Sequence, residues 1–90
     1  MGARSAPVAL AAGALVTSVG ALAGVSFRET AGAAATVKLY DNASAASGKL
    51  LGTFGLAALG SIDTEYVNGR QITNGVYAVI TGTVEGSIFI

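Results

Sequence analysis

The C-terminal stretch, residues 74–90, constrains the fold more than any other part of the chain. It contains two runs rich in β-branched and aromatic residues, 76–80 and 84–90, with glycine before or within each run. Such runs are typical of strands, and glycine permits the positive φ of turns and bulges. We therefore predict two consecutive strands that form a hairpin. Because a lone hairpin is at best marginally stable in water, other parts of the chain must supply strands that cover it.

Both faces of the first predicted strand are apolar. Val76, Ala78 and Ile80 alternate with Tyr77 and Val79. We expect a central strand, with one face in the core and the other against a second sheet element or a neighbouring subunit.

The composition indicates one small domain that gains stability from association. A chain of 90 residues buries only about 60–65% of its unfolded surface. It has no cysteine for disulfides, and its residues are 52% hydrophobic and 11% charged, whereas soluble domains average about 25% charged residues. Five basic and five acidic residues cancel and are scattered along the chain. Nucleic-acid binding, which needs clustered cations, is therefore not expected.

The N-terminal region is rich in alanine and glycine, and Arg4 is its only charged residue up to Val25. We expect residues 1–21 to form an extended arm on a neighbouring subunit, ahead of a β-sandwich domain at residues 22–90. Removing residues 1–19 is then expected to weaken assembly while leaving the body folded. A signal or membrane anchor at residues 1–23 is the alternative, with Arg4 as its charged start and Ala21-Leu22-Ala23 as a small-residue cleavage site.

Period-two alternation predicts the other strands. It places Val25 and Phe27 opposite Arg28, Val37 and Leu39 opposite Lys38, and Ile62, Thr64 and Tyr66 opposite Asp63 and Glu65. A further strand is expected at residues 50–54, where two nearby glycines argue against a helix. Asn68-Gly69 and Asn74-Gly75 are turn signals that we expect to end or begin strands. Six or seven short strands predict an all-β fold, a small antiparallel sandwich or barrel.

The sequence offers little catalytic chemistry. It contains neither histidine nor cysteine, so the usual general base and the commonest metal ligands are missing. Asp63 and Glu65 share a strand face and could bind a cation or place two acids in a cleft, but a solvent-facing strand side explains them better. We assign no catalytic, cofactor-binding or metal-binding residues, expect no cofactor, and predict that the protein is not an enzyme. The aromatic residues are interpreted as core and interface anchors, namely Phe27, Tyr40, Phe54, Tyr66, Tyr77 and Phe89.

Several short segments occur in a characteristic order after Gly24. They are Phe27-Arg28-Glu29-Thr30-Ala31-Gly32, Ala35-Thr36-Val37-Lys38-Leu39-Tyr40-Asp41, Ala46-Ser47-Gly48, Leu56-Ala57-Ala58, Asn74-Gly75-Val76-Tyr77 and Gly82-Thr83-Val84-Glu85-Gly86. In these segments the chain resembles a group of small virion proteins of tailed bacteriophages that infect actinobacteria and related hosts. The resemblance implies a capsid decoration or cement protein with a β-sandwich body.

The same resemblance implies partners and a location. A cement protein would bind the major capsid protein or another virion protein and would self-associate as a homo-oligomer, for example a trimer. It would be made in the host cytoplasm and reside on the capsid surface, without nucleic-acid or membrane contacts. Alternatives are a head-fibre or tail component, or a secreted or membrane-attached binding module that uses residues 1–23 as signal or anchor.

The alternation predicts a mainly antiparallel β protein with little helix. Far-ultraviolet circular dichroism of the purified chain should therefore show a β-type spectrum. A spectrum dominated by helical minima would contradict the sandwich.

Overall fold

The structure is a computed structural model that describes residues 7–90, apart from the side chains of residues 67 and 68. Within this range the chain forms eight strands and no helix, which confirms the predicted all-β fold class. The strands are β1 (Pro7–Ala9), β2 (Gly13–Val16), β3 (Gly20–Glu29), β4 (Ala35–Tyr40), β5 (Leu50–Leu56), β6 (Ser61–Ile72), β7 (Val76–Thr81) and β8 (Val84–Phe89).

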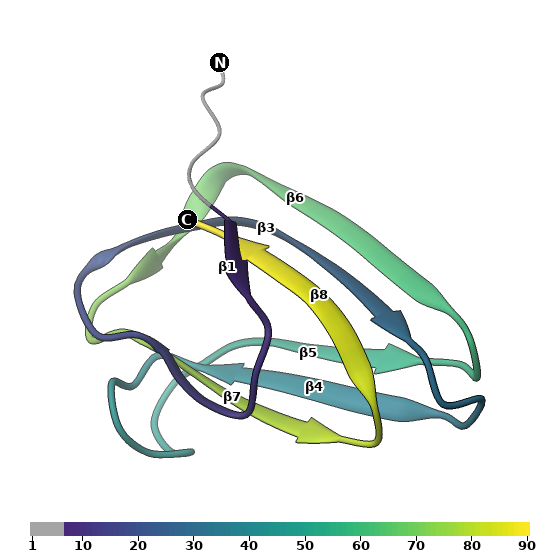
Figure 1. Cartoon of the computed structure of the whole chain (residues 1–90). Coiled ribbons are helices and arrows are strands. Elements are labelled where there is room, and N and C mark those ends of the chain that lie inside the picture. The colour runs from purple at the N-terminus through teal and green to yellow at the C-terminus, as the bar shows by residue number, and fades with distance from the viewer. Residues whose placement is uncertain (1–6) are drawn as a thin grey trace.

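The strands form two four-stranded antiparallel sheets that pack face to face (Figure 1). Sheet 1 has the order β1-β8-β3-β6, and sheet 2 has the order β2-β7-β4-β5. Strand pairs run from the ends of the chain towards its middle: β1 with β8, β2 with β7, β3 with β6, and β4 with β5. Eight strands in this order make a jelly roll, a double-sheet sandwich built from two Greek keys.

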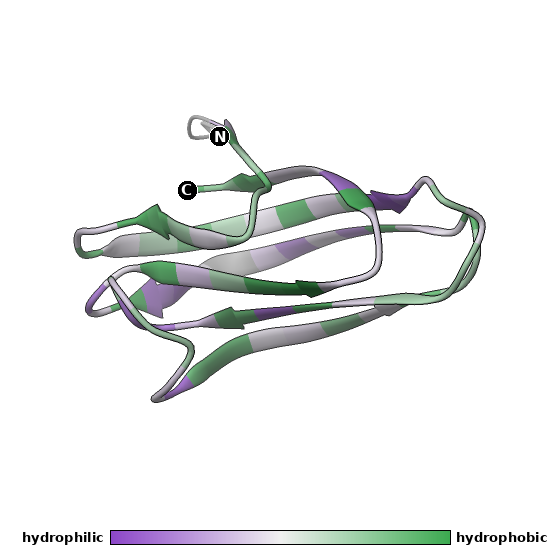
Figure 2. Cartoon of the chain, turned by 60° about the horizontal axis from the view of Figure 1, so that its bottom comes forward, coloured by the Kyte–Doolittle hydropathy of each residue, from purple (hydrophilic) through white to green (hydrophobic). Residues whose placement is uncertain are grey.

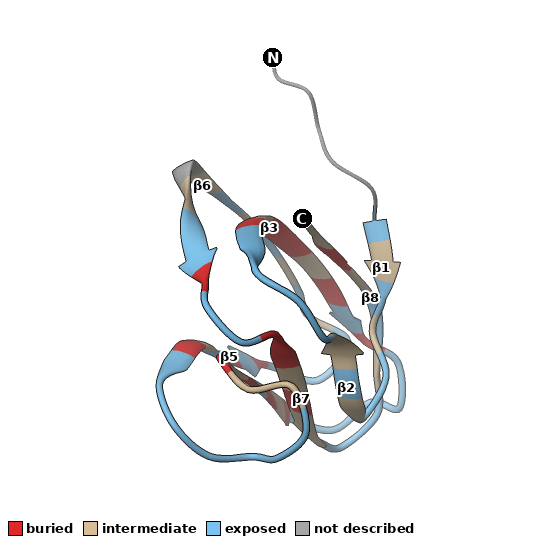
Figure 3. Ribbon diagram, turned by 90° about the vertical axis from the view of Figure 1, so that its left-hand side faces the viewer, coloured by how far each residue is buried: buried red, intermediate tan, exposed pale blue. Residues whose placement is uncertain are grey.

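The core lies between the sheets, where the inward residues predicted from the alternation are found. Val25 and Phe27 of β3 and Val37 and Leu39 of β4 are each at most 2% exposed. Figure 2 shows the alternation of hydropathy along the strands, and Figure 3 shows buried residues recurring along strands of both sheets. The Phe27 ring meets the Phe54 ring edge to face, with centroids 5.3 Å apart, so this pair joins β3 of sheet 1 to β5, an edge strand of sheet 2.

The predicted C-terminal hairpin is wrong, because its two strands belong to different sheets. Strand β7 pairs with β2 and β4, whereas β8 pairs with β1 and β3. The short connection between them crosses from sheet 2 to sheet 1 (Figure 1). Gly82 permits the crossing, because it has a φ of +96° and a Cβ there would lie 2.8 Å from the Cβ of Ala35. Two consecutive apolar strands therefore lie in different sheets instead of pairing with each other.

Strand β7 is a central strand, but only one of its faces is covered within the chain. Val76 and Ala78 are buried in the core, at 0% and 1% exposure. Tyr77 and Val79 lie on the outer face of sheet 2 and are half-buried. No other strand among the described residues covers that face, and cover by a neighbouring subunit stays a prediction.

From Pro7 onward, the expected N-terminal arm is part of the sandwich. Strand β1 lies beside β8, β2 lies beside β7, and β3 already begins at Gly20. The half-buried side chains of Val8, Leu10, Leu15 and Val16 pack against the core. Residues 1–6 lie outside the described range. Alternating small and apolar residues were sufficient for these strands, although alanine and glycine give only a weak strand pattern.

The two Asn-Gly turn signals differ in outcome. Asn74-Gly75 lies between β6 and β7, as predicted. Asn68-Gly69 lies inside β6, where the register with β3 shifts between Leu22 and Gly24. The second signal therefore marks an irregularity within a long strand, and the prediction that it ends a strand is wrong.

The structure revises the expected effect of removing residues 1–19. Their loss would expose one side of β8 and of β7 and would strip four half-buried apolar side chains from the core. We now predict that the truncated chain lacks the cooperative thermal transition of the full chain. Differential scanning calorimetry measures this, and a truncated chain with an unchanged melting temperature would contradict it.

Candidate protein interaction surfaces

The connections between strands divide into two groups of different character. Those after β3, β5 and β7 lie at one end of the sandwich, those after β2, β4 and β6 lie at the other, and the connection after β1 crosses between the sheets nearer the middle (Figure 1). The first group, which we call the uncharged end, comprises residues 30–34, 57–60 and 82–83, and none of them carries a charge. The second group, the polar end, comprises residues 17–19, 41–49 and 73–75 and includes Asp41, Asn42, Lys49 and Asn74.

A buried glutamate organises the uncharged end. Glu29 is the last residue of β3, points inward and is 0% exposed. Its Oε1 accepts hydrogen bonds from the backbone N–H of Gly32 at 2.8 Å, Ala33 at 3.2 Å and Leu59 at 2.7 Å. Its Oε2 accepts one from the N–H of Ala31 at 2.7 Å. A single carboxylate therefore joins the β3–β4 connection to the β5–β6 connection, which follow strands of different sheets.

Leu59 is held in an unusual way at this end. It has a φ of +56°, a left-handed conformation that is uncommon for a leucine. Its N–H is bound to Glu29, yet its side chain is 67% exposed. Exposed residues with strained backbone occur preferentially at functional sites. The neighbouring exposed side chains on both connections are chiefly alanine, so Leu59 is the largest apolar group in a small apolar surface.

A buried aspartate performs the equivalent task at the polar end. Asp41 follows β4 and is 6% exposed. Its carboxylate accepts hydrogen bonds from the N–H groups of Thr73, Asn74 and Gly75, at distances from 2.8 to 3.3 Å. It thereby connects sheet 2 with the chain segment that arrives from β6 of sheet 1.

The hydrogen bonds set the acidity of both groups. The pKa of Glu29 lies below its ordinary value of 4.5, chiefly because the N–H of Leu59 stabilises the ionised form, and this outweighs the opposing effect of burial. The pKa of Asp41 is likewise lowered, with the N–H of Asn74 as the main cause. Both groups are therefore carboxylates at neutral pH, and they act as structural anions.

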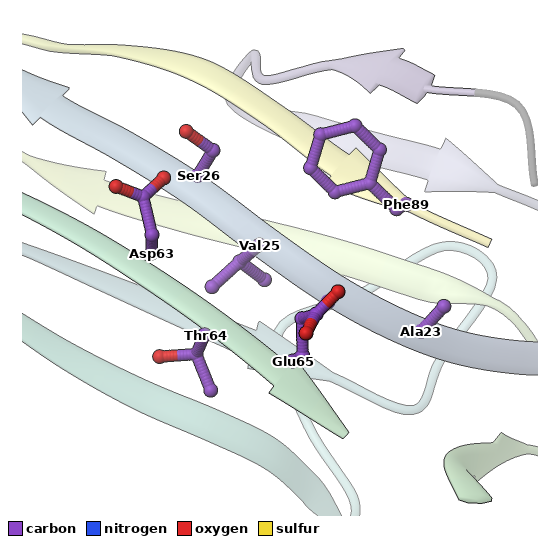
Figure 4. A pocket seen from close by; sticks show the side chains of 8 residues that line it. Ala23, Val25, Ser26, Asp63, Thr64, Glu65 and Phe89 are labelled. Carbon is purple, nitrogen blue, oxygen red and sulfur yellow. The ribbon is translucent and has the colours of Figure 1, made fainter. Parts of the chain in front are cut away.

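The outer face of sheet 1 contains a hollow between three strands (Figure 4). Its floor is Gly24, which in the strand register lies between Phe89 of β8 and Glu65 of β6. A Cβ at position 24 would lie 2.6 Å from the carbonyl oxygen of Thr64, so only glycine fits there. Ser26 and Asp63 form the adjacent row and point to the same side as Phe89 (Figure 4). The hollow thus presents one aromatic ring, one hydroxyl and two carboxylates.

The outer face of sheet 2 is largely uncharged. Tyr40 and Tyr77 are opposite each other on β4 and β7, and Lys38 is opposite Val79. Leu50 at the edge is 44% exposed. Lys38 is the only charged side chain among the described outward-facing residues of this sheet. Tyrosine is enriched at protein contact surfaces, so this face is a candidate for such a contact.

The structure brings together some of the residues that the sequence singled out. Asp63 and Glu65 share the outer face of sheet 1 and are exposed, as predicted for a solvent-facing strand side. Phe27 and Phe54 are core residues, whereas Phe89, Tyr40 and Tyr77 are half-buried on outer faces. Tyr66 packs at the margin of the core, with the Arg70 guanidinium 4.7 Å from its ring centroid.

Sequence reasoning missed the roles of Glu29, Asp41 and Leu59. A signal existed for the two acids, since Glu29 continues the inward series of Val25 and Phe27, and Asp41 continues that of Val37 and Leu39. An ionisable group at an inward position must be satisfied by hydrogen bonds. No comparable signal marks Leu59, because its conformation depends on a hydrogen bond to a residue distant in sequence.

No family model matches the chain, and neither curated proteins nor solved structures provide a match. Among the described residues, no group of three or more histidine, cysteine, aspartate or glutamate side chains could hold a metal ion. The described part of the chain also contains no helix long and apolar enough to cross a membrane.

The lowered pKa of Glu29 predicts a pH-dependent stability. A group with a depressed folded-state pKa contributes its full stabilisation above its unfolded value, here 4.5, and loses it as the pH falls through the folded value. Glu29→Gln removes the anion and places an amide NH₂ group among N–H donors. We expect this variant to melt at a lower temperature at pH 7 and to lose less stability than the wild type when the pH falls below 4.5.

Denaturant unfolding between pH 7 and pH 3 tests the prediction. The matched control is Glu85→Gln, because Glu85 is an exposed glutamate on the outer face of sheet 1. If Glu29→Gln and Glu85→Gln gave the same pH dependence as the wild type, the carboxylate would not hold the connections together.

Proposed function

We propose that this chain is a non-enzymatic structural protein of a virion, a decoration or cement protein that binds the major capsid protein or another virion protein and stabilises the shell. Its site of action would be the capsid surface, after synthesis in the host cytoplasm. The sequence resemblance supports this role, and jelly rolls are common in capsid proteins, although lectins and cupins share them. Because one fold hosts many functions, the surface of the protein, and not its fold, has to support this role.

The strongest structural support for this proposal is the uncharged end of the sandwich. Three connections lie there without a charge, and Glu29 fixes two of them by four hydrogen bonds to backbone N–H groups. A surface ordered before binding loses little conformational entropy on contact. Leu59, 67% exposed, is the natural anchor for an apolar depression on a capsid subunit.

Small apolar contacts suit a protein that acts in many copies. One contact of this size gives modest affinity, but a symmetric shell repeats it at every equivalent position. Copies that also contact one another bind with an effective concentration far above that of the free protein. The shell is then stabilised by the number of contacts rather than by the strength of each one.

The fold disfavours the alternative in which residues 1–23 are a cleaved signal. Cleavage after Ala23 would remove β1, β2 and the start of β3, including the fully buried Leu22. The mass of the protein in particles distinguishes the two, because a retained N-terminus excludes cleavage. A head-fibre or tail component remains a second placement of the same structural role.

Replacing the exposed leucine tests the proposed contact. We expect Leu59→Asn to fold with a melting temperature close to that of the wild type, since asparagine tolerates positive φ. Burial of a leucine side chain contributes about 1.5–3 kcal/mol, so binding to virus particles assembled without this protein should weaken by roughly ten- to a hundredfold. Cosedimentation with such particles measures the affinity.

Val19→Asn is the matched control, because Val19 is a 73% exposed apolar residue at the polar end. It should bind particles like the wild type. Equal weakening by both substitutions, or by neither, would show that the uncharged end is not the contact. A wild-type protein that neither binds nor copurifies with particles would refute the proposed function itself.

A further inference from the structure

The two outer faces of the sandwich differ in charge. The outward residues of sheet 1 include three carboxylates, Asp63, Glu65 and Glu85, and one guanidinium, that of Arg28. Arg28 lies opposite Glu85 in the β3–β8 register, so the excess negative charge is concentrated at Asp63 and Glu65. The outward residues of sheet 2 in the described range carry one ammonium group and no carboxylate.

Sheet 1 has a hollow on its outer face, and sheet 2 has an exposed long side chain on its own. On sheet 1, Asp63, Glu65 and the Phe89 ring surround the hollow above Gly24 (Figure 4). On sheet 2, Lys38 is exposed on the central strand β4, between Val79 of β7 and Thr53 of β5. A lysine side chain that enters the hollow would bring its ammonium group to two carboxylates and its methylene stem to an aromatic ring.

We propose that two copies of this chain associate head to tail, with Lys38 on sheet 2 of one copy seated in the Asp63–Glu65–Phe89 hollow on sheet 1 of the next. Contacts between like faces are disfavoured, because a twofold axis through sheet 2 would bring two Lys38 side chains together and one through sheet 1 would bring four carboxylates together. Tyr40, Tyr77 and Val79 around Lys38 supply the apolar part of the contact.

The chain has enough surface for a specific interface. Stable interfaces bury roughly 800 Å² per partner, which is about a sixth of the 4686 Å² of surface that the chain exposes. Burial of half-exposed tyrosines would provide the main stabilisation, and the lysine with its two carboxylates would set the register.

The inference builds on the self-association included in the proposed function and specifies its geometry. Sheet 1 and sheet 2 are on opposite sides of the sandwich, so each copy would have one face occupied and one face free. Such a heterologous contact continues as a stack unless a rotation closes it into a ring. The uncharged end lies at the side of the stack and remains available for another protein.

Charge reversal on purified protein without particles tests the head-to-tail contact. In sedimentation velocity, the apparent mass of the wild-type protein should increase with protein concentration and decrease at high salt. Lys38→Glu and the double variant Asp63→Lys/Glu65→Lys should each associate at least about tenfold more weakly. An equimolar mixture of the two should recover association, because the faces of each variant are complementary to those of the other. Lys49→Glu, a charge reversal in the exposed β4–β5 connection, should behave like the wild type.

Any of the following results would exclude the proposed head-to-tail contact. A wild type that stays monomeric at millimolar concentration excludes the contact, and so does a mixture that fails to recover association. Weakening by only one of the two reversals indicates an interface between like faces. All of these variants alter exposed residues, and circular dichroism confirms that they fold. Because no particles are present, failure here leaves the Leu59 experiment, and with it the capsid proposal, to be judged separately.

Discussion

Hydrogen bonds from two buried carboxylates to backbone N–H groups hold the ends of this sandwich together. The connections that they bind consist mainly of alanine, glycine and threonine, which have few atoms to pack against one another. An ionised carboxylate can accept several hydrogen bonds at once, and charge-assisted bonds are stronger than neutral ones. Glu29 and Asp41 therefore replace the side-chain packing that such short residues cannot provide, one at each end, and both link segments from different sheets.

The burial of these two carboxylates explains how the remaining charges are distributed over the surface. Two of the five acidic residues are buried as anchors, which leaves three carboxylates outside, all on sheet 1. Sheet 2 and the uncharged end are consequently apolar or lightly charged. A small domain with few charged residues thus separates a negative face, a face with one cation and an apolar end, and each can contact a different neighbour.

The fold class and the inward faces followed from the sequence, because period two is a local property that each strand displays by itself. Val25, Phe27, Val37 and Leu39 were placed correctly for that reason. Strand pairing depends on residues far apart in the sequence, and no single segment reveals it. The hairpin expected at residues 76–90 therefore proved to be a crossing between sheets. Strands β1 and β2 were missed because alanine and glycine lack the β-branched pattern. The partners of Glu29 depended on where the crossings place the connections, which no single segment reveals.

The order in which the strands pair also determines when the protein can fold during its synthesis. Strand β1 lies beside β8, with Pro7 opposite Phe89, and β3 needs both β6 and β8 as neighbours. Among the described strands, only β4 and β5 are partners that follow one another in the chain, so nearly every contact first requires the closure of a long loop. Sheet 1 cannot be completed on the ribosome before the last strand emerges. A chain that stops short of residue 84 would leave β1 and β3 with open edges, which are prone to pair with other chains.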